Sequence, residues 1–224
     1  MFETGYDTFK KDILLITKID LNAYKERQMK RRIDTLIAKH GFKTYNDFVA
    51  AIKVNKILLD EFVNYLTINV SEFYRNPEQW TYLEEKVIPE LIKNYGHGIR
   101  IWSAACSTGD EPYSLAMLLT KFLPLNQIHI IDKQVLEKAH MGIYKDKSLV
   151  ALPKEFLVKY FRKINDDTYQ IKDEIKKCVE FRQANLLKDS YPEHCHLILC
   201  RNVLIYFTEE AKLEIYKKFN DSLV

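Results

Sequence analysis

The chain has 224 residues, of which 47% are hydrophobic and 29% are charged, the balance of an ordinary globular protein. This length suffices for one good core, or for one core and a small helical domain. No apolar run approaches the ~20 residues of a membrane span, the N-terminus lacks a secretory signal, and a net charge of +3 does not by itself indicate nucleic-acid binding. The four cysteines form no CxxC pair, so we expect reduced thiols in a cytosolic protein.

Residues 1–76 carry helical patterns throughout. Cap-type residues at Asp20 and Asn22 precede a helix that we expect to end at Lys39, and a second helix begins near Thr44. A third covers Ile57–Leu66. Short polar turns join these segments, as in a small helical bundle.

One helix of this bundle is strongly basic. Arg27, Lys30 and Arg31 share one face because they are spaced at i, i+3 and i+4. Such a face is either simply solvated or binds an acidic protein partner or nucleic acid. No aromatic residues are interleaved with these charges, which weighs against single-stranded nucleic acid. An acidic protein surface is the better interpretation.

The segment Leu66–Arg75 follows the bundle. Ser71 caps a turn and Arg75 forms a surface ion pair in the simplest interpretation. Alternatively, Arg75 is carried from one domain into the cleft of another, where it grips a carboxylate in a bidentate manner. Beyond Asn76-Pro77 we expect a helix to Lys93, with a kink or split at Pro89.

After Gly98 the pattern changes to alternating strands and helices. This alternation predicts a mostly parallel sheet whose ligands bind beyond the carboxyl ends of the strands. We expect an inserted subdomain at about residues 148–178. The predicted strands are Ile99–Trp102, Gln127–Ile131, Val179–Gln183 and His196–Cys200, and the predicted helices are Pro112–Phe122, Lys133–Met141 and Glu209–Phe219.

The stretch Arg100–Leu115 predicts a strand, a turn of small residues and the start of a helix. Such a turn lets a ligand approach the backbone and meet free helix N–H groups. The turn has neither a GxGxxG motif nor a P-loop lysine, and Asp110 and Glu111 would repel phosphates. A ligand with ribose hydroxyls and a positive charge, such as S-adenosylmethionine, suits it; an ordinary strand–turn–helix junction is the alternative.

Polar residues also follow two later strands. Asn185 can present an amide to a base or ribose, or it can be a common turn residue. Arg201 and Asn202 come directly after an apolar strand, so they face solvent or meet a ligand. The nearby run His194-Cys195-His196 has the wrong spacing for a structural zinc site, and we expect no metal.

Several long motifs in a consistent order resemble the chemotaxis receptor methyltransferases. They span most of the chain and comprise QMKRRI (Gln28–Ile33), LTINVSEFYR (Leu66–Arg75), IWSAACSTGDEPYSLA (Ile101–Ala116), VLEKAHMGIY (Val135–Tyr144), VEFRQANLL (Val179–Leu187) and CRNVLIYF (Cys200–Phe207).

The resemblance implies a class I S-adenosylmethionine-dependent methyltransferase domain of the α/β, Rossmann-like type, preceded by a small all-α domain and carrying a small β-subdomain insertion. The expected division is a helical receptor-docking domain at residues 1–76, a linker helix at 77–98, and the methyltransferase domain at 99–224. The family continues through a glycine turn into two more strands, so we expect the last domain to be incomplete at its C-terminal end.

Site residues follow from the same resemblance. Residues matching Arg75 and Tyr206 lie near the transferred methyl group, which implies catalytic roles for both. Receptor docking falls on Arg27, Lys30 and Arg31. Cofactor binding falls on Asn69, Ser71, Arg75, Ala105, Glu111, Asn185, Leu186, Arg201 and Asn202.

The implied activity is methylation of glutamate side chains on bacterial chemoreceptors, with S-adenosylmethionine as donor and S-adenosylhomocysteine as product. The expected partner is the cytoplasmic helical domain of a chemoreceptor, and we expect a cytoplasmic monomer that neither inserts into a membrane nor binds nucleic acid. A non-catalytic receptor-docking module that binds S-adenosylmethionine is the alternative.

The chain departs from the family pattern after its second strand. The family shows Thr-Asp-Ile-Asp there, and its first Asp holds the ribose. This chain has a single acid, Asp132, which matches the second Asp, so that Ile130 stands at the first position or a few residues are missing.

Overall fold

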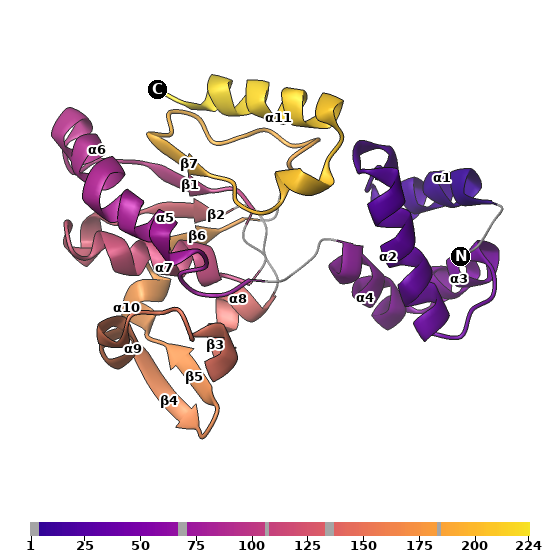
Figure 1. Cartoon of the computed structure of the whole chain (residues 1–224), viewed down its shortest axis with the longest axis horizontal. Helices are drawn as coiled ribbons and strands as arrows, with labels where there is room; N and C mark the ends of the chain where they lie inside the picture. Colours follow the sequence, from indigo (N-terminus) through magenta and orange to yellow (C-terminus); the bar gives the residue numbers. More distant parts are fainter. Residues whose placement is uncertain (1–4, 67–70, 106–107, 133–136, 183–184) are drawn as a thin grey trace. The chain divides into compact units, whose positions relative to one another are not determined.

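The computed structural model describes residues 5–66, 71–105, 108–132, 137–182 and 185–224. By its internal contacts the chain forms two compact units. One comprises residues 1–69 and Val203–Glu214, and the other comprises Val70–Asn202 and Ile215–Val224. Residues 70–76, which the sequence groups with the helical domain, therefore belong to the second unit. Figure 1 shows the elements of both units along the chain.

The first unit is a helical bundle around an aromatic core. The rings of Phe9, Phe48 and Phe62 meet edge-on or tilted, with centroids 5.3–6.5 Å apart, as aromatic pairs prefer. Thr44 caps its helix by accepting the N–H of Asp47 at 3.1 Å. The four helices are α1 (Tyr6–Thr17), α2 (Glu26–Lys39), α3 (Tyr45–Val54) and α4 (Lys56–Leu66), with a single 3₁₀ turn at Leu21–Ala23 before α2.

A later piece of chain completes this unit. The 3₁₀ turn Leu204–Tyr206 and the beginning of α11 (Glu209–Ser222) cluster with residues 1–69. Tyr24 and Phe207 form an isolated antiparallel β-bridge, and their rings stack at 4.8 Å. The helical unit therefore contains the backbone of Tyr206.

The second unit opens with the expected helix, which is divided as Pro89 predicts. Here α5 (Pro77–Tyr82) passes through a π-helical segment, Leu83–Val87, into α6 (Ile88–Tyr95). Proline has no N–H, and its ring clashes with the carbonyl four residues earlier. The wider π turn directly before Pro89 relieves that clash while the helix continues.

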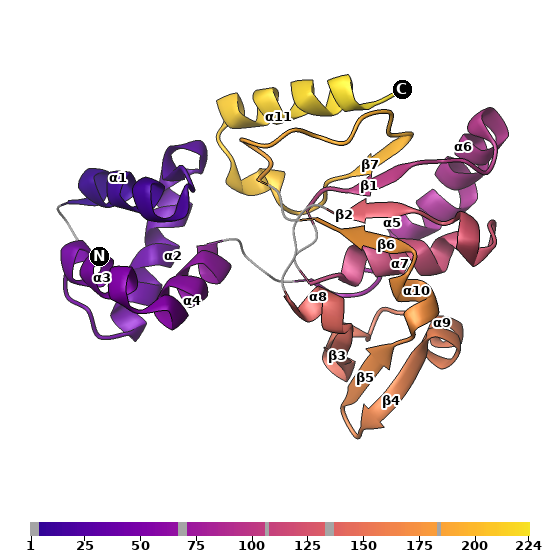
Figure 2. The same ribbon diagram turned by 180° about the vertical axis from the view of Figure 1, so that it is seen from behind.

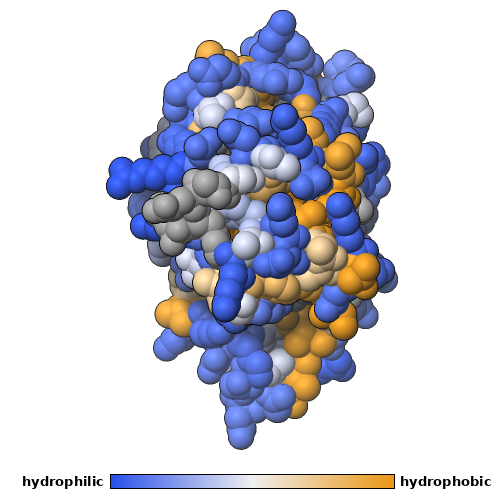
Figure 3. Space-filling model, turned by 90° about the vertical axis from the view of Figure 1, so that its right-hand side faces the viewer, coloured by the Kyte–Doolittle hydropathy of each residue, from blue (hydrophilic) through white to orange (hydrophobic). Residues whose placement is uncertain are grey.

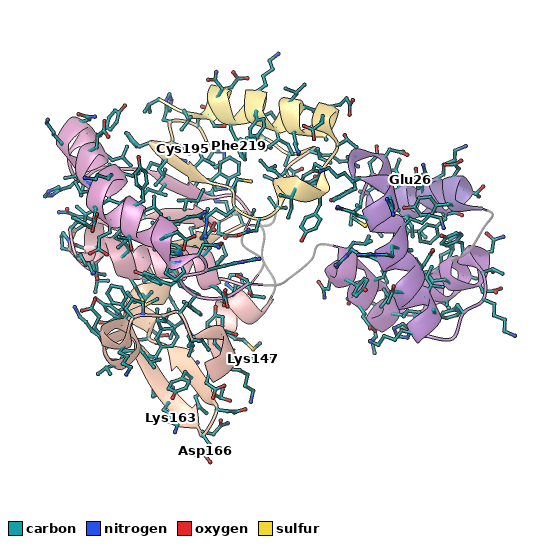
Figure 4. All side chains as sticks on the ribbon, in the orientation of Figure 1. Glu26, Lys147, Lys163, Asp166, Cys195 and Phe219 are labelled. Atoms are coloured by element: carbon teal, nitrogen blue, oxygen red, sulfur yellow. The ribbon has the colours of Figure 1, made fainter. Side chains whose placement is uncertain are left out.

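The central sheet is parallel and has the order β6-β2-β1-β7. Alternate residues face opposite sides: Ile101 and Ile130 join the core with α7, while Trp102 and Ile131 join Phe219 of α11. The layers are visible in Figure 1, and Figure 4 shows Phe219 and Cys195 between α11 and the sheet. The bounds are β1 (Ile101–Ser103), α7 (Asp110–Leu119), β2 (Ile130–Asp132), α8 (Glu137–Met141), β6 (Val179–Phe181) and β7 (Leu197–Leu199).

A small antiparallel sheet lies between β2 and β6 in the sequence, with the order β3-β5-β4 (Figure 2). It contains β3 (Ile143–Lys145), β4 (Phe161–Asn165) and β5 (Thr168–Ile171), with α9 (Lys154–Tyr160) and α10 (Asp173–Lys176) beside it. The sheet thus begins before residue 148, and β4 is a strand that the sequence did not reveal. Only Phe161 is buried in it, and the exposed residues include Ile164 as well as Arg162, so apolar and polar residues do not alternate along the strand.

In the described part of the chain, no helix is long and apolar enough to cross a membrane. The face drawn in Figure 3 is mainly hydrophilic, with apolar groups gathered toward one side.

Gly109 begins α7 with a backbone φ of +88°, and a Cβ there would lie 2.7 Å from the hydroxyl oxygen of Tyr144. We predict that Gly109→Ala lowers the free energy of unfolding by about 1–3 kcal/mol, because the methyl group meets both backbone strain and fixed neighbours. Denaturant unfolding measures the change. Gly98→Ala is the matched control, since nothing lies within 4 Å of its Cβ position. Equal stabilities of the two variants would contradict the prediction.

Candidate functional site

The topology of the sheet defines where a ligand can bind. From β1 the chain proceeds to β2 and β6 on one side and then returns to β7 on the other. The order therefore reverses between β1 and β7, and open α/β sheets bind ligands at the carboxyl ends of such a pair. The segment after β1 leads to Glu111, and the segment after β7 begins with Cys200 and Arg201.

Glu111 and Arg201 meet at this place. Oε2 of Glu111 lies 3.5 Å from Nη1 of Arg201, and the two side chains are only 12% and 15% exposed. Oε1 of Glu111 accepts a hydrogen bond of 3.0 Å from the hydroxyl of Ser103, the last residue of β1. The sequence-predicted turn thus presents a buried carboxylate beside a buried guanidinium.

Burial dominates the electrostatics of this pair. It raises the pKa of Glu111, although Arg201 and the Ser103 hydroxyl act in the opposite direction. Burial likewise lowers the pKa of Arg201 despite the attraction of Glu111. Burial also raises the pKa of the neighbouring Cys200 thiol to about 12, with a further contribution from Glu111.

Arg201 also fastens the segment that contains Arg75. Its Nη2 donates to the carbonyl oxygen of Arg75 at 2.5 Å and to Oδ1 of Asn76 at 3.3 Å. Its Nε donates to Oε1 of Gln79 at 2.8 Å, and its guanidinium lies over the ring of Trp80, 5.3 Å from the centroid. Five groups thus fix one guanidinium, as its rigid fork of donors allows.

Arg75 occupies an unusual turn. The residues on either side, Tyr74 and Asn76, have φ values of 54° and 58°, in the left-handed region that a bulky side chain rarely adopts. The indole N–H of Trp80 donates to the Arg75 carbonyl at 3.0 Å, and the Tyr74 N–H donates to the hydroxyl of Ser114 at 3.1 Å. Strained backbone of this kind persists only where its surroundings determine it, and it is typical of functional sites.

The remaining cofactor-site predictions fall in several places. Ser71 and Ala105 are half-buried, and Ala105 lies between β1 and α7. Asn185 and Leu186 follow β6; the Asn185 side-chain oxygen accepts the N–H of Leu187 at 2.9 Å, as in an Asx turn. Asn202 is exposed, with φ of 59°.

One predicted residue, Tyr206, belongs to the other unit. Asn69 lies outside the described residues. Tyr206 is half-buried in its 3₁₀ turn, where its carbonyl oxygen accepts the N–H of Lys25 at 2.9 Å. The structure thus brings together Arg75, Glu111 and Arg201 in the second unit, whereas Tyr206 belongs to the first unit.

The basic face of α2 divides into two kinds of residue. Arg27 and Arg31 are exposed. Lys30 instead lies 3.2 Å from the carboxylate of Asp34 and 5.6 Å from the ring centroid of Tyr6. Asp34 is buried and also accepts the hydroxyl of Tyr45 at 2.5 Å. Lys30 is therefore part of the packing of the helical unit.

The departure at β2 is clear in the structure. Ile130, Ile131 and Asp132 form a continuous strand in register with β1, in which Ile130 pairs with Ile101. Ile130 is buried in the core, and Asp132 is buried at the carboxyl end of the strand beside Ser103. Ile130 thus stands inside the sheet, and Asp132 is the acid that reaches the ligand-binding edge.

Among the described residues, no group of three or more His, Cys, Asp or Glu is placed to hold a metal ion. Sequence reasoning missed the residues that hold Arg201, above all Gln79 and Trp80, and the partner of Glu111, Ser103, was noted only as a turn residue. The α5 residues carry no local signal, because only the tertiary fold brings them to a guanidinium far along the chain.

The raised pKa of Glu111 has a consequence for stability. The folded state holds the Glu111 proton more tightly than the unfolded chain does, so protonated Glu111 stabilises the fold. This stabilisation is complete below the unfolded pKa of 4.5 and is lost as pH rises through the folded pKa. We predict that Glu111→Gln, which is neutral throughout, gains stability relative to the natural chain as pH rises from 4.5 to 8. Urea unfolding across this range measures the difference.

Glu180→Gln is the control with the opposite sign. A hydrogen bond from Arg182 lowers the pKa of exposed Glu180, so its contribution is present at neutral pH and is lost as pH falls through the folded pKa. The relative stability of Glu180→Gln should therefore fall as pH rises. If both variants show the same slope, the description of Glu111 is wrong.

Comparison with known proteins agrees with this architecture. Residues 69–224 match the family model "CheR methyltransferase, SAM binding domain", and residues 4–67 match "CheR methyltransferase, all-alpha domain". A chemotaxis protein methyltransferase from Listeria innocua is 41% identical over 96% of this chain and 86% of its own length. Similarly named proteins from Borreliella burgdorferi and Pseudomonas aeruginosa are 32% and 35% identical, each over 92% of this chain and over 78% and 80% of their own lengths. The expected fold class and cofactor class are thus confirmed, and the chain belongs to the CheR methyltransferase family.

Proposed function

We propose that this protein transfers a methyl group from S-adenosylmethionine to glutamate carboxylates of a bacterial chemoreceptor. The observation that carries the proposal is the buried pair Glu111–Arg201 at the reversal point of the sheet, joined to the turn of Arg75. The family match to a SAM-binding domain and the names of the relatives support it.

The residues fit this cofactor. The pKa of Glu111 is raised by burial, so a cationic group such as the α-ammonium of the methionine moiety relieves the cost of the ionised carboxylate. Gly109 leaves no room for a Cβ, so the backbone at the start of α7 is tightly packed and fixed in place. Ser71, Ala105, Asn185, Leu186 and Asn202, together with Asn69, remain proposed contacts of the cofactor.

The bound cofactor supplies a methyl group on a positively charged sulfur, which is open to direct displacement by a carboxylate. A substrate glutamate is already ionised near neutral pH, so the protein needs no general base. Its task is to align the carboxylate and remove water from it. Arg75 orients the incoming carboxylate through its guanidinium, and Tyr206 donates a hydrogen bond.

The role of Arg75 is positional. Charge on the attacking carboxylate disappears as the ester forms, so a strong ion pair in the ground state would slow the reaction. The backbone of Arg75 is fixed through its carbonyl oxygen by Trp80 and Arg201, which limits the region that its guanidinium can reach.

We predict that Arg75→Ala lowers methyl transfer to receptor membranes by about 100-fold, because a misaligned carboxylate rarely reaches the attacking geometry. The assay follows labelled methyl groups released as methanol by base, with calorimetry of S-adenosylmethionine binding alongside. Arg100→Ala, at an exposed position before β1, is the control and should retain full turnover.

Two outcomes would contradict these assignments. Near-normal turnover of Arg75→Ala would remove its positioning role. If the natural chain binds S-adenosylmethionine but transfers no methyl group that base releases as methanol, the protein is a non-catalytic receptor-docking module.

We further propose that the exposed Arg27 and Arg31 dock on acidic helices of the cytoplasmic receptor domain, which places the protein in the cytoplasm and, we expect, as a monomer. Lys30 is held by Asp34 and contributes less. The charge of two exposed arginines steers association more than it stabilises the complex.

The double variant Arg27→Glu/Arg31→Glu should raise the KM for receptor membranes about tenfold and remove most of its salt dependence, with kcat unchanged. Initial rates at several receptor and salt concentrations measure this. Lys53→Glu, an exposed charge reversal on α3, is the control. If the KM and its salt dependence stay unchanged in the double variant, the docking face lies elsewhere.

A further inference from the structure

The backbone that carries Tyr206 is held by a segment of the helical unit. The N–H of Lys25 donates to the carbonyl oxygen of Tyr206 at 2.9 Å, and the N–H of Thr208 donates to the carbonyl oxygen of Ala23 at 2.9 Å. These two bonds flank the β-bridge of Tyr24 and Phe207. Tyr24 and Phe207 are thus a non-hydrogen-bonded antiparallel pair, the kind whose side chains lie closest together. Their two rings stack with centroids 4.8 Å apart.

Without this bridge the turn would have little to fix it. Leu204–Tyr206 is a single 3₁₀ turn with two internal hydrogen bonds. The Tyr206 N–H donates to the carbonyl oxygen of Val203, and the Phe207 N–H donates to that of Leu204. Short 3₁₀ turns have poor hydrogen-bond geometry and are marginal alone. Ile205 in this turn is 55% exposed, so the turn is not secured by core packing at that position.

We propose that Ala23–Lys25 is a positioning element for Tyr206, because the bridge holds the backbone of this residue within the helical unit. The inference rests on the proposed function through the role of Tyr206. Tyr24 contributes the stacked ring, and Lys25 contributes the backbone N–H.

The backbone of Lys25 permits an unusually clean test. Lys25 has φ of −60°, which is the angle that proline imposes, and Tyr24 before it has φ of −107° and ψ of 153°, in the region that precedes proline. Lys25→Pro therefore keeps the φ of Lys25 but replaces the N–H by the ring Cδ, which removes the hydrogen bond and displaces the carbonyl oxygen of Tyr206. Lys25→Ala removes the same side chain and keeps the N–H, so it is the matched reference.

We expect Lys25→Pro to lower kcat for methyl transfer at least about fivefold relative to Lys25→Ala, because it removes one backbone hydrogen bond and also displaces its acceptor. The affinity for S-adenosylmethionine by calorimetry should be equal in the two variants, which also verifies that the second unit is folded. Equal kcat values would overturn the inference.

A double-variant cycle distinguishes positioning from general loosening. In a Tyr206→Phe background, which lacks the hydroxyl, Lys25→Pro should lower kcat no further than Lys25→Ala does. If the fivefold difference persists in that background, the effect does not act through Tyr206, and the inference is wrong.

Amide hydrogen exchange tests the bridge without using turnover. The Thr208 N–H should exchange faster in Lys25→Pro than in Lys25→Ala, because opening the bridge at one bond frees the other. Unchanged protection would contradict the inference. If the natural chain shows no methyl transfer, the proposed function is wrong. Hydrogen exchange at the Thr208 N–H still decides separately whether the bridge holds the backbone of Tyr206.

Discussion

The methyltransferase unit depends on one guanidinium at the point where its sheet reverses direction. Arg201 follows β7, contacts Glu111 from the segment after β1, and fixes the backbone of Arg75 before α5. Three segments far apart in the sequence are thereby held to one another by a single side chain. Open parallel sheets bind ligands at this position, and the contacts of Arg201 bring Glu111 and the Arg75 turn together there.

The same arrangement explains why the site is poised for a ligand. A buried ion pair gains less from mutual attraction than its members lose by leaving water unless further groups satisfy them. Here Ser103 supports Glu111, and Gln79, Asn76 and Trp80 support Arg201, yet burial still raises the pKa of the carboxylate. In the proposed function, the cationic end of the cofactor lies against this carboxylate. The left-handed turn around Arg75 is held by contacts of the same Arg201 and Trp80.

Sequence reasoning located most of this framework because local patterns carried it. The small-residue turn with Glu111, the Arg-Asn pair after an apolar strand and the break at Asn76-Pro77 all lie where the chain changes structure. The strand β4 was missed because apolar and polar residues do not alternate along it. Trp80 and Gln79 were missed because their contacts with Arg201 depend on the tertiary fold, and the bridge of Tyr24 to Phe207 was missed for the same reason. The position of Lys30 on its helix face predicted a role in docking, but in the structure Lys30 forms an ion pair with the buried Asp34.

The proposed cofactor site consists of Glu111, Arg201 and the turn of Arg75. A crystal structure of the protein with S-adenosylhomocysteine is the decisive measurement. We expect the product to lie across the carboxyl ends of β1 and β7, with its α-ammonium group against Glu111. A product bound elsewhere, or one whose ammonium group has no contact with Glu111, would contradict it.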